Sequence, residues 1–265
     1  KSEKYEEAIN QFNKIVSADD EVAQNAYYHL GASYLQMEKK SEALNAFKNA
    51  AGMDYNPNIR KDANFNYAKL SFTIGNPYES ATDVMIRFVD QYPDSEEADE
   101  VSRLVIQSYI TEQNYSKGIN YLEKIGPKEN YVLYHELLTL YGLQLYNQRS
   151  YAEASQYLDK AGDIQASPKA RNKALFWSGE SAYNQEQFAK AEKQYNQFLK
   201  TNPRLNTYEN GLIRYNLGYS QFKQENYSVA ISNFQKYVAN NASTDIQRKN
   251  DANLRIADAY FIEGD

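Results

Sequence analysis

Small, aromatic and aliphatic residues return along this 265-residue chain at intervals of 35 to 39 residues. The residue three positions before each small one is aromatic in six of seven repeats, and bulky or small apolar residues follow four and seven positions after it. Offsets of −3, 0, +4 and +7 lie on one face of an α-helix, so each repeat is predicted to contain one amphipathic helix. The small residues are Ala8, Ala43, Ala81, Gly118, Ala154, Ala191 and Ala230.

A second column lies twelve residues before the first and is rich in glycine. It contains Gly31, Gly142, Gly179 and Gly218, while Lys69 and Ile106 depart from it. Glycine inside a helix costs about 1 kcal/mol relative to alanine, so its recurrence needs a reason. We expect that a neighbouring helix approaches too closely at these positions for a side chain to fit. Each repeat is therefore predicted to be a pair of antiparallel helices.

These two columns resemble the signature of the tetratricopeptide repeat (TPR). The match includes "LGASY" at 30–34 followed by Ala43 and Phe47, "LGYSQF" at 217–222 followed by Ala230 and Phe234, and "FLKTNP" ending at Pro203. The resemblance implies an all-α fold, a right-handed α-α superhelix of antiparallel helix pairs. It also implies that the first helix of each pair lines a concave groove that holds a protein or peptide.

The pattern is incomplete at both ends of the chain. The first repeat has only its second helix, predicted over Tyr5 to Val16, and the last has only its first helix, predicted within 250–265. Residues 1–265 are therefore expected to form a single TPR solenoid of about fourteen helices. It would comprise six full helix pairs flanked by a half repeat at each end, as a fragment of a longer protein.

The connections between repeats are longer than the family norm. Such connections, and "RFVDQYPDSEEADEV" at 87–101 above all, resemble the TPR proteins of the bacterial cell envelope. That group includes outer-membrane assembly lipoproteins and Tol–Pal-associated periplasmic proteins. The resemblance favours a periplasmic or envelope location over a cytoplasmic one.

Charge and composition limit the classes of partner that the chain is expected to bind. The chain has 29 basic and 35 acidic residues, a net charge of −6, which argues against a nucleic-acid partner because phosphate binding needs clustered Lys and Arg. It has no cysteine, which excludes thiolate chemistry, and no apolar run of ~18 residues that could insert into a membrane. Its 25 tyrosines suit a thin structure, in which a ring can be buried while the hydroxyl stays in water. A monomer is expected.

Catalytic chemistry is not predicted. The two histidines, His29 and His135, belong to different repeats, and no nucleophile–base arrangement accompanies either of them. The chain has no glycine-rich phosphate loop and no paired metal-ligand spacing, so we expect neither a cofactor nor a metal. We therefore predict that the protein is not an enzyme.

Two other motifs have structural explanations. In "DSEEADE" at 94–100, Asp94 or Ser95 is predicted to cap a helix whose N-terminal dipole is complemented by Glu96 and Glu97. Trp177 is the only tryptophan and adjoins Gly179. We expect it to pack between helices, although stacking on a carbohydrate is an alternative.

A second stripe on the first helices is the candidate binding surface. Its residues are spaced by three, four and three positions, and such a stripe, beyond the packing face, is what a groove needs. Aromatic anchors framed by polar groups are typical binding hot spots. The candidates are Lys173, Phe176, Glu180, Tyr183 and Asn184 in one repeat, and Leu212, Tyr215, Tyr219, Phe222 and Lys223 in the next.

The leading functional hypothesis is a non-catalytic scaffold that binds a protein or peptide in this groove. The rings could instead only pack against neighbouring first helices. The runners-up are a cell-envelope module that contacts carbohydrate and a purely structural spacer. Capture of a chaperone tail is disfavoured, because the positions of the family's two-carboxylate clamp hold Tyr28 and Ala32 where Lys and Asn would be needed.

Overall fold

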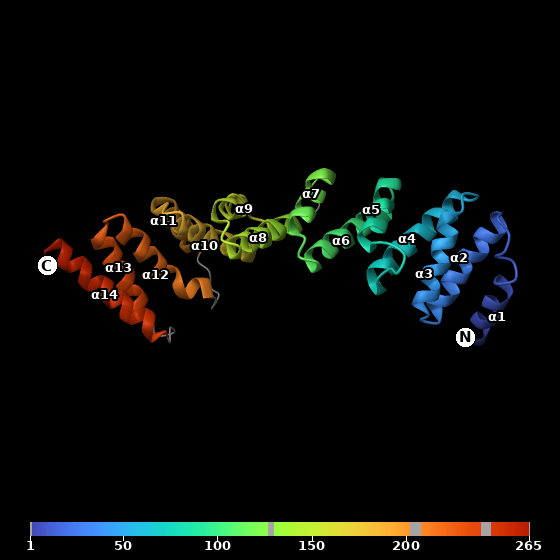
Figure 1. The fold of residues 1–265 in the computed structure, drawn as a ribbon, viewed down its shortest axis with the longest axis horizontal. Coiled ribbons are helices and arrows are strands. Elements are labelled where there is room, and N and C mark those ends of the chain that lie inside the picture. The colour runs from blue at the N-terminus through green and yellow to red at the C-terminus, as the bar shows by residue number, and fades with distance from the viewer. Residues whose placement is uncertain (1, 127–129, 202–207, 240–244, 265) are drawn as a thin grey trace. The chain divides into compact units, whose positions relative to one another are not determined.

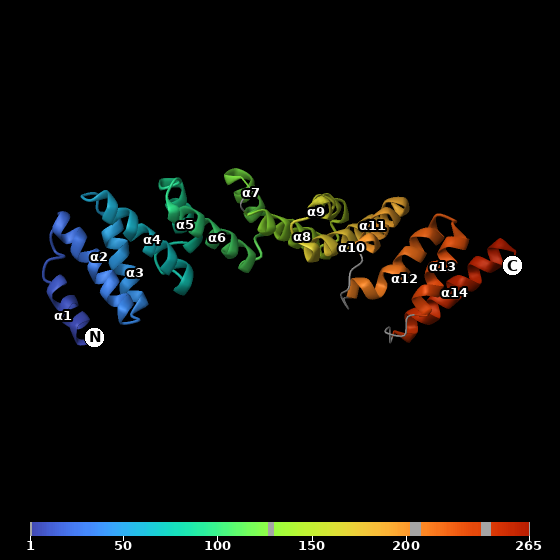
Figure 2. The same ribbon diagram turned by 180° about the vertical axis from the view of Figure 1, so that it is seen from behind.

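The computed structural model describes residues 2–126, 130–201, 208–239 and 245–264. All regular elements in these ranges are α-helices, fourteen in number (Figure 1; reverse view in Figure 2). They fall into two compact units, Lys1–Asn114 and Tyr115–Asp265. The extension of one solenoid through both units stays a prediction.

Each unit contains helices that pack mainly on their neighbours in the sequence. The helices of the first unit are α1 (Ser2–Phe12), α2 (Glu21–Gln36), α3 (Lys40–Gly52), α4 (Pro57–Ile74), α5 (Ala81–Gln91) and α6 (Glu96–Thr111). The helices of the second unit are α7 (Tyr115–Ile125), α8 (Tyr131–Asn147), α9 (Tyr151–Asp163), α10 (Pro168–Asn184), α11 (Phe188–Lys200), α12 (Tyr208–Lys223), α13 (Tyr227–Val238) and α14 (Ile246–Glu263). In addition, α2 contacts α4, α8 contacts α10, and α10 contacts α12, so first helices of successive pairs lie side by side.

Many first helices begin at a polar residue that caps them. The side chains of Asp20, Asn56, Ser167 and Asp245 accept hydrogen bonds from backbone N–H groups in the first turn. These donors have no partner within the helix, so the caps satisfy them. Proline follows Asn56 and Ser167 directly, where its missing N–H does no harm.

Two predicted helix ends need correction. Helix α1 ends at Phe12 rather than at Val16, because the backbone of residues 14 and 15 bonds three residues back instead of four. Ser95 holds the capping position of α6, but its side chain makes no capping hydrogen bond. The predicted acidic residues do lie in the first turn of α6, and one of them, Glu97, pairs with Lys61 at 3.0 Å.

Five of the six turns inside the helix pairs share one conformation. Their central residue is left-handed, at φ values of 57° to 62°, whereas Gly75 in the sixth turn combines a φ of 79° with an extended ψ of 171°. In the turn after α12, Glu225 is this residue, and the Asn226 N–H donates back to the carbonyl of Gln221 at 2.9 Å. This bond closes the helix end in the Schellman manner. The central residues of the six turns are Glu38, Gly75, Gln113, Arg149, Glu186 and Glu225.

The glycine column marks close helix contacts, as predicted. A Cβ atom added at Gly31 would lie 2.7 Å from the ring of Phe47, and one at Gly218 would lie 2.8 Å from the ring of Phe234. Distances this short are overlaps, so alanine would force the neighbouring helix away. The same holds for Gly142 against Leu158.

The predicted register of the second repeat is shifted by one residue. Counted from the central turn residue, Ala68 takes the glycine position, and it is fully buried. Lys69, which the sequence pattern placed there, is half-exposed and pairs with Glu100 at 2.8 Å. The extra residue of this repeat lies in the turn before Ala81, not within the helix.

His135 is a structural residue. It lies seven positions before Gly142, and Gln24 lies seven positions before Gly31. Both side chains form hydrogen bonds with the segment that leads to the next helix pair. The Gln24 amide accepts from the backbone N–H of Asn56 at 2.7 Å, and Nδ1 of His135 accepts from that of Ser167 at 3.2 Å. Burial lowers the pKa of His135 and keeps the imidazole neutral.

Candidate functional site

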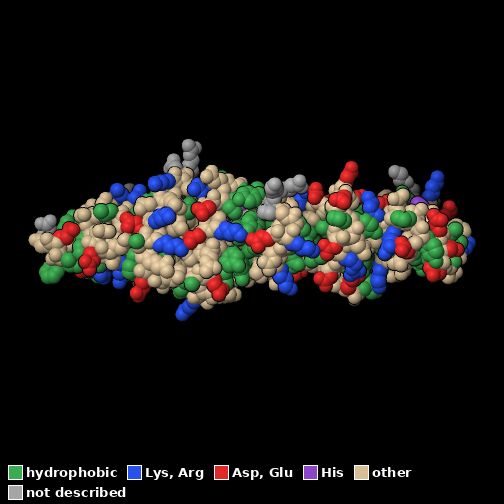
Figure 3. Space-filling model, turned by 90° about the horizontal axis from the view of Figure 1, so that it is seen from above, with side chains coloured by type: hydrophobic (Ala, Val, Ile, Leu, Met, Phe, Trp, Pro, Cys, Tyr) green, Lys and Arg blue, Asp and Glu red, His purple; other side chains and the backbone are tan. Residues whose placement is uncertain are grey.

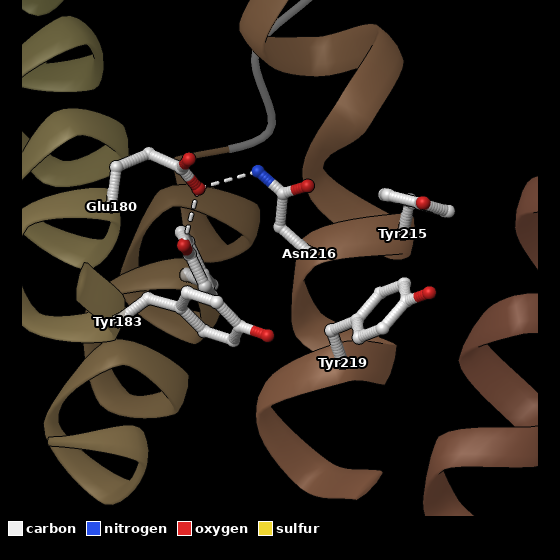
Figure 4. A pocket seen from close by; sticks show the side chains of 6 residues that line it. Glu180, Tyr183, Tyr215, Asn216 and Tyr219 are labelled. Atoms are coloured by element: carbon white, nitrogen blue, oxygen red, sulfur yellow. Dashed lines mark hydrogen bonds between the residues drawn. The ribbon is translucent and has the colours of Figure 1, made fainter. Parts of the chain in front are cut away.

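The candidate site is a pocket of about 220 Å³ in the second unit, between α10 and α12 with α11 behind them (Figure 4). Its lining combines tyrosine rings, a carboxylate and an amide. The lining residues are Glu180, Tyr183, Tyr195, Tyr215, Asn216 and Tyr219.

The helical repeat places these side chains together. Glu180 and Tyr183 are three positions apart on α10, and Tyr215 and Tyr219 are four apart on α12, so each pair shares one helix face. Tyr195 reaches the pocket from α11 because it packs against Gly179, where any Cβ would overlap its ring. The glycine column therefore shapes the back of the pocket as well as the helix contact.

Hydrogen bonds join the pocket walls. Oε1 of Glu180 accepts from the Tyr195 hydroxyl and from the Asn216 side-chain amide, which links α10 to α11 and α12 (Figure 4). On the other side of the pocket, the hydroxyls of Tyr215 and Tyr219 both donate to Asp251 of α14, from Tyr215 at 2.7 Å.

Burial is the largest cause of the pKa shifts of these groups. It raises the pKa of the Glu180 carboxyl, while the hydrogen bonds from Tyr195 and Asn216 act in the opposite direction. Burial, with Glu180 nearby, raises the pKa of Tyr195 well above its ordinary value. Burial and the bond to Asp251 raise the pKa of Tyr219 to about 12. The tyrosines are therefore neutral hydrogen-bond donors at physiological pH, and Glu180 is the one acidic residue among the six that line the pocket.

The ten predicted groove residues divide into three groups. Glu180, Tyr183, Tyr215 and Tyr219 line the pocket. Phe176 and Leu212, only 1% and 9% exposed, belong to the core beneath it. The remaining four lie outside its lining: Phe222 packs edge-on against Tyr227, Asn184 donates to the Glu180 carbonyl at 2.8 Å, and Lys173 and Lys223 are exposed.

Sequence reasoning missed three members of the site. Tyr195, four positions after Ala191, falls in the predicted packing stripe, and the stripe on the first helices contains neither Asn216 nor Asp251. A signal was present: Asn216 follows Glu180 by 36 residues, and Asp251 follows Tyr215 by 36 residues. In both pairs, the hydrogen-bond partner of a polar residue on a first helix lies one repeat further along the chain.

Trp177 packs between helices, as predicted. Its ring meets Tyr146 edge-on at 4.8 Å and stacks on Tyr208 at 6.4 Å between centroids. Its indole N–H donates to Glu209 at 3.2 Å. These contacts account for the tryptophan as a packing residue.

A second hollow, of about 300 Å³, lies in the first unit between the end of α1 and the start of α2. There the ring of His29 stacks on Phe12 with centroids 5.6 Å apart. The hollow is lined by Phe12, Ile15, Glu21, Val22, Asn25, Ala26 and His29.

The surface and composition of the described part offer few other sites. Acidic and basic side chains are interspersed over the face drawn in Figure 3. Among the described residues, no group of three or more His, Asp or Glu side chains could hold a metal ion. Within those same ranges, no helix combines the length and apolar character that crossing a membrane requires.

Family comparisons identify the repeat. Residues 176–245 and 215–265 match one tetratricopeptide-repeat family model, and residues 24–57 match a second. These segments are tetratricopeptide repeats. A search of curated proteins found no match.

A solved TPR structure supports the fold. The C-terminal part of a TPR repeat-containing protein from Cytophaga hutchinsonii is 17% identical, with a TM-score of 0.51 over 92% of this chain and 94% of that one. Pseudomonas aeruginosa pilF is 18% identical, with a TM-score of 0.38 over 90% of this chain and 89% of that one. Yeast Tom70 is 15% identical, with a TM-score of 0.31 over 99% of this chain and 60% of that one. The predicted all-α fold of TPR helix pairs is confirmed, with the first of these structures as support.

Proposed function

We propose that this chain is a non-catalytic scaffold that binds a protein or peptide segment on the surface formed by its first helices. TPR folds generally serve as scaffolds for protein–protein interaction. The observation that carries the proposal is the pocket between α10 and α12, where partly exposed tyrosines adjoin a carboxylate and an amide. Such a mixture of rigid aromatic and polar groups is typical of interface hot spots.

The proposal assigns different roles to the predicted groove residues. Tyr183, Tyr215 and Tyr219 provide contact area, because their rings are partly exposed in the pocket. Phe176 and Leu212 support the surface from below and have too little exposed area to touch a partner.

Site-specific cross-linking tests the proposal. A photo-reactive phenylalanine analogue replaces Tyr183 in the pocket or, as a matched control, the exposed Lys193 on the second helix α11. We expect cross-links to a protein partner from position 183 and not from position 193. Circular dichroism confirms that both proteins stay folded. Equal capture at the two positions, or capture at 193 alone, would contradict the proposed surface.

The two alternatives make different forecasts for the same protein. A carbohydrate-contacting module would bind cell-wall glycan fragments and change the fluorescence of Trp177, whereas a structural spacer would bind no ligand. The contacts of Trp177 with Tyr146, Tyr208 and Glu209 already explain its position, so neither alternative gains support from it.

We also propose a periplasmic or cell-envelope location and a monomeric state. The likeness of residues 87–101 to envelope TPR proteins supports the location. Fractionation of cells that express the full-length gene tests it, and recovery in the cytoplasmic fraction would contradict it. Light scattering of the purified chain tests the monomer.

A further inference from the structure

Glu180 is the acidic group in the pocket lining, and no described cationic side chain pairs with it. Its Oε1 atom accepts hydrogen bonds from two neutral groups, the Tyr195 hydroxyl and the Asn216 amide. Within the described ranges, no Lys, Arg or His nitrogen forms an ion pair with it at 4.0 Å or less. A carboxylate can accept about four hydrogen bonds, so capacity remains for a cationic donor. Because an ionised carboxylate is unfavourable in a buried position without a partner, a cation bound here would stabilise the ionised form of Glu180.

The tyrosine rings also favour a cation in the pocket. The face of an aromatic ring attracts a cation within about 6 Å of its centroid, and four tyrosines line the pocket. Two of them, Tyr215 and Tyr219, donate their hydroxyls to Asp251, which places a second negative charge behind the rings. Arg255 offsets that charge only in part, because its Nη1 atom lies 2.6 Å from Asp258 while its Nε atom lies 3.9 Å from Asp251.

The same chain already uses this interaction elsewhere. In the first unit, the ammonium group of Lys48 lies 3.7 Å from the ring centroid of Tyr78. In the second unit, the ammonium group of Lys160 lies 5.1 Å from that of Tyr134. In the pocket, the tyrosine rings lie beside a carboxylate, that of Glu180.

The size of the pocket suits one side chain. Its 220 Å³ equals the volume of about seven water molecules at ~30 Å³ each. Pockets for drug-sized ligands typically begin at about 300 Å³. A flexible methylene stem with a cationic head fits this space, and the stem can lead back to a peptide on the first-helix surface.

We propose that this pocket receives the side chain of a lysine or arginine from a bound peptide segment, with Glu180 as its counter-ion and the tyrosine rings as an aromatic cage. The proposal rests on the proposed scaffold function and deepens it by giving the chemistry of one anchor residue of the partner. Asn216 and Tyr195 hold the Glu180 carboxylate in place and do not themselves pair with the cation.

Titration with small amides tests the proposal. The probes are N-acetyl-lysine amide and N-acetyl-arginine amide, with N-acetyl-norleucine amide and N-acetyl-citrulline amide as neutral controls of similar shape. The readout is the ¹⁹F NMR signal of 3-fluorotyrosine incorporated at position 219. We expect saturable shifts with the cationic probes, at dissociation constants on the order of millimolar, and none with the neutral ones.

Three variants resolve the contributions. Glu180→Gln keeps the shape of the side chain and removes its charge, and we expect it to weaken binding of the cationic probes at least about tenfold. Tyr183→Leu removes one ring, with an expected loss of about fivefold. Glu186→Gln removes an exposed carboxylate outside the pocket lining and should leave binding unchanged.

Several results would overturn the proposal. It fails if the neutral amides bind as tightly as the cationic ones, if Glu180→Gln binds like the wild type, or if no probe gives a saturable shift. Tighter binding of choline, with no binding of the lysine and arginine amides, would assign the pocket to a small-molecule cation instead. The scaffold function is judged separately. A partner that cross-links from position 183 through a segment without lysine or arginine would sustain that function and reject the cation pocket.

Discussion

At the scale of single residues, Glu180 connects the chemistry of the pocket with the stability of the fold. Its carboxylate is held among three helices, and burial raises its pKa in the folded chain. A carboxyl with a raised pKa binds its proton more readily in the folded than in the unfolded state. The stability that it contributes is therefore present at low pH and is lost as the pH rises through the folded pKa.

The Glu180→Gln variant isolates this effect. As the pH rises from the ordinary carboxyl pKa of 4.5 through the raised pKa of the folded state, the wild type loses stability that the variant keeps, so the stability of the variant relative to the wild type should increase with pH. Chemical denaturation of both proteins at a series of pH values measures the difference, and other titrating groups cancel. A difference that is flat, or that falls with pH, would show that the pKa of Glu180 is not raised.

Single residues also show how far sequence reasoning reaches into the site. Tyr215 and Tyr219 could be predicted as pocket residues because helical spacing alone places them on the first-helix surface. Phe176 and Leu212 have the same spacing and yet are buried in the core of the second unit. Rings of α11, those of Tyr195 and Phe198, pack on Phe176, and a pattern within one helix does not show such contacts. Asn216 and Asp251 were missed because their partners lie one repeat away, and a helical pattern describes only neighbours within one helix.

At the scale of elements, the turns within the helix pairs contain strain. The five left-handed turn residues are not glycine, although a left-handed conformation costs a residue with a Cβ roughly 1–2 kcal/mol. In the turn between α12 and α13, the Glu225 side chain is exposed, so only the backbone constrains the choice of residue.

Glu225→Gly should therefore stabilise the chain. We expect a gain of about 0.5–1 kcal/mol, because relief of the left-handed strain exceeds the extra entropy that glycine gives the unfolded chain. Glu225→Ala is the control: it removes the same side chain but keeps the strain, and should change little. Denaturant unfolding measures both variants. A destabilised glycine variant would mean that the Glu225 side chain makes a contribution of its own.

Element boundaries could be predicted where a local signal sets them. The caps at Asn56 and Ser167, each followed by proline, are readable from the sequence. The end of α1 and the extra turn residue before Ala81 are not, because both depend on how the backbone hydrogen bonds close. Lys69 is twelve positions before Ala81 and so matches the spacing of the glycine column. The extra turn residue between them moves the true glycine position to Ala68.

At the scale of the whole molecule, the contacts are mainly between neighbouring helices. Stability in such an architecture is approximately a sum of local terms, so damage should stay local. The close contact between Gly218 and Phe234 belongs to the second unit, far along the chain from helices α2 to α5.

Gly218→Ala tests this locality. The added methyl group overlaps the ring of Phe234, and we expect a loss of about 1–3 kcal/mol. Hydrogen exchange should show weakened protection in α12 and α13 and unchanged protection in α2 to α5. Gly211→Ala, in the same helix but with no neighbour within 4 Å, is the matched control and should stabilise by about 0.5–1 kcal/mol. Equal loss of protection in both units after Gly218→Ala would show that the chain unfolds as one cooperative body.

The left-handed turns also have a practical consequence for experiments on recognition. Glu186 and Glu225 lie outside the pocket lining, in separate turns, so glycine at both should give additive gains. A chain with these two replacements would be a more stable background in which to make pocket variants. Impaired ligand affinity could then be told apart from partial denaturation.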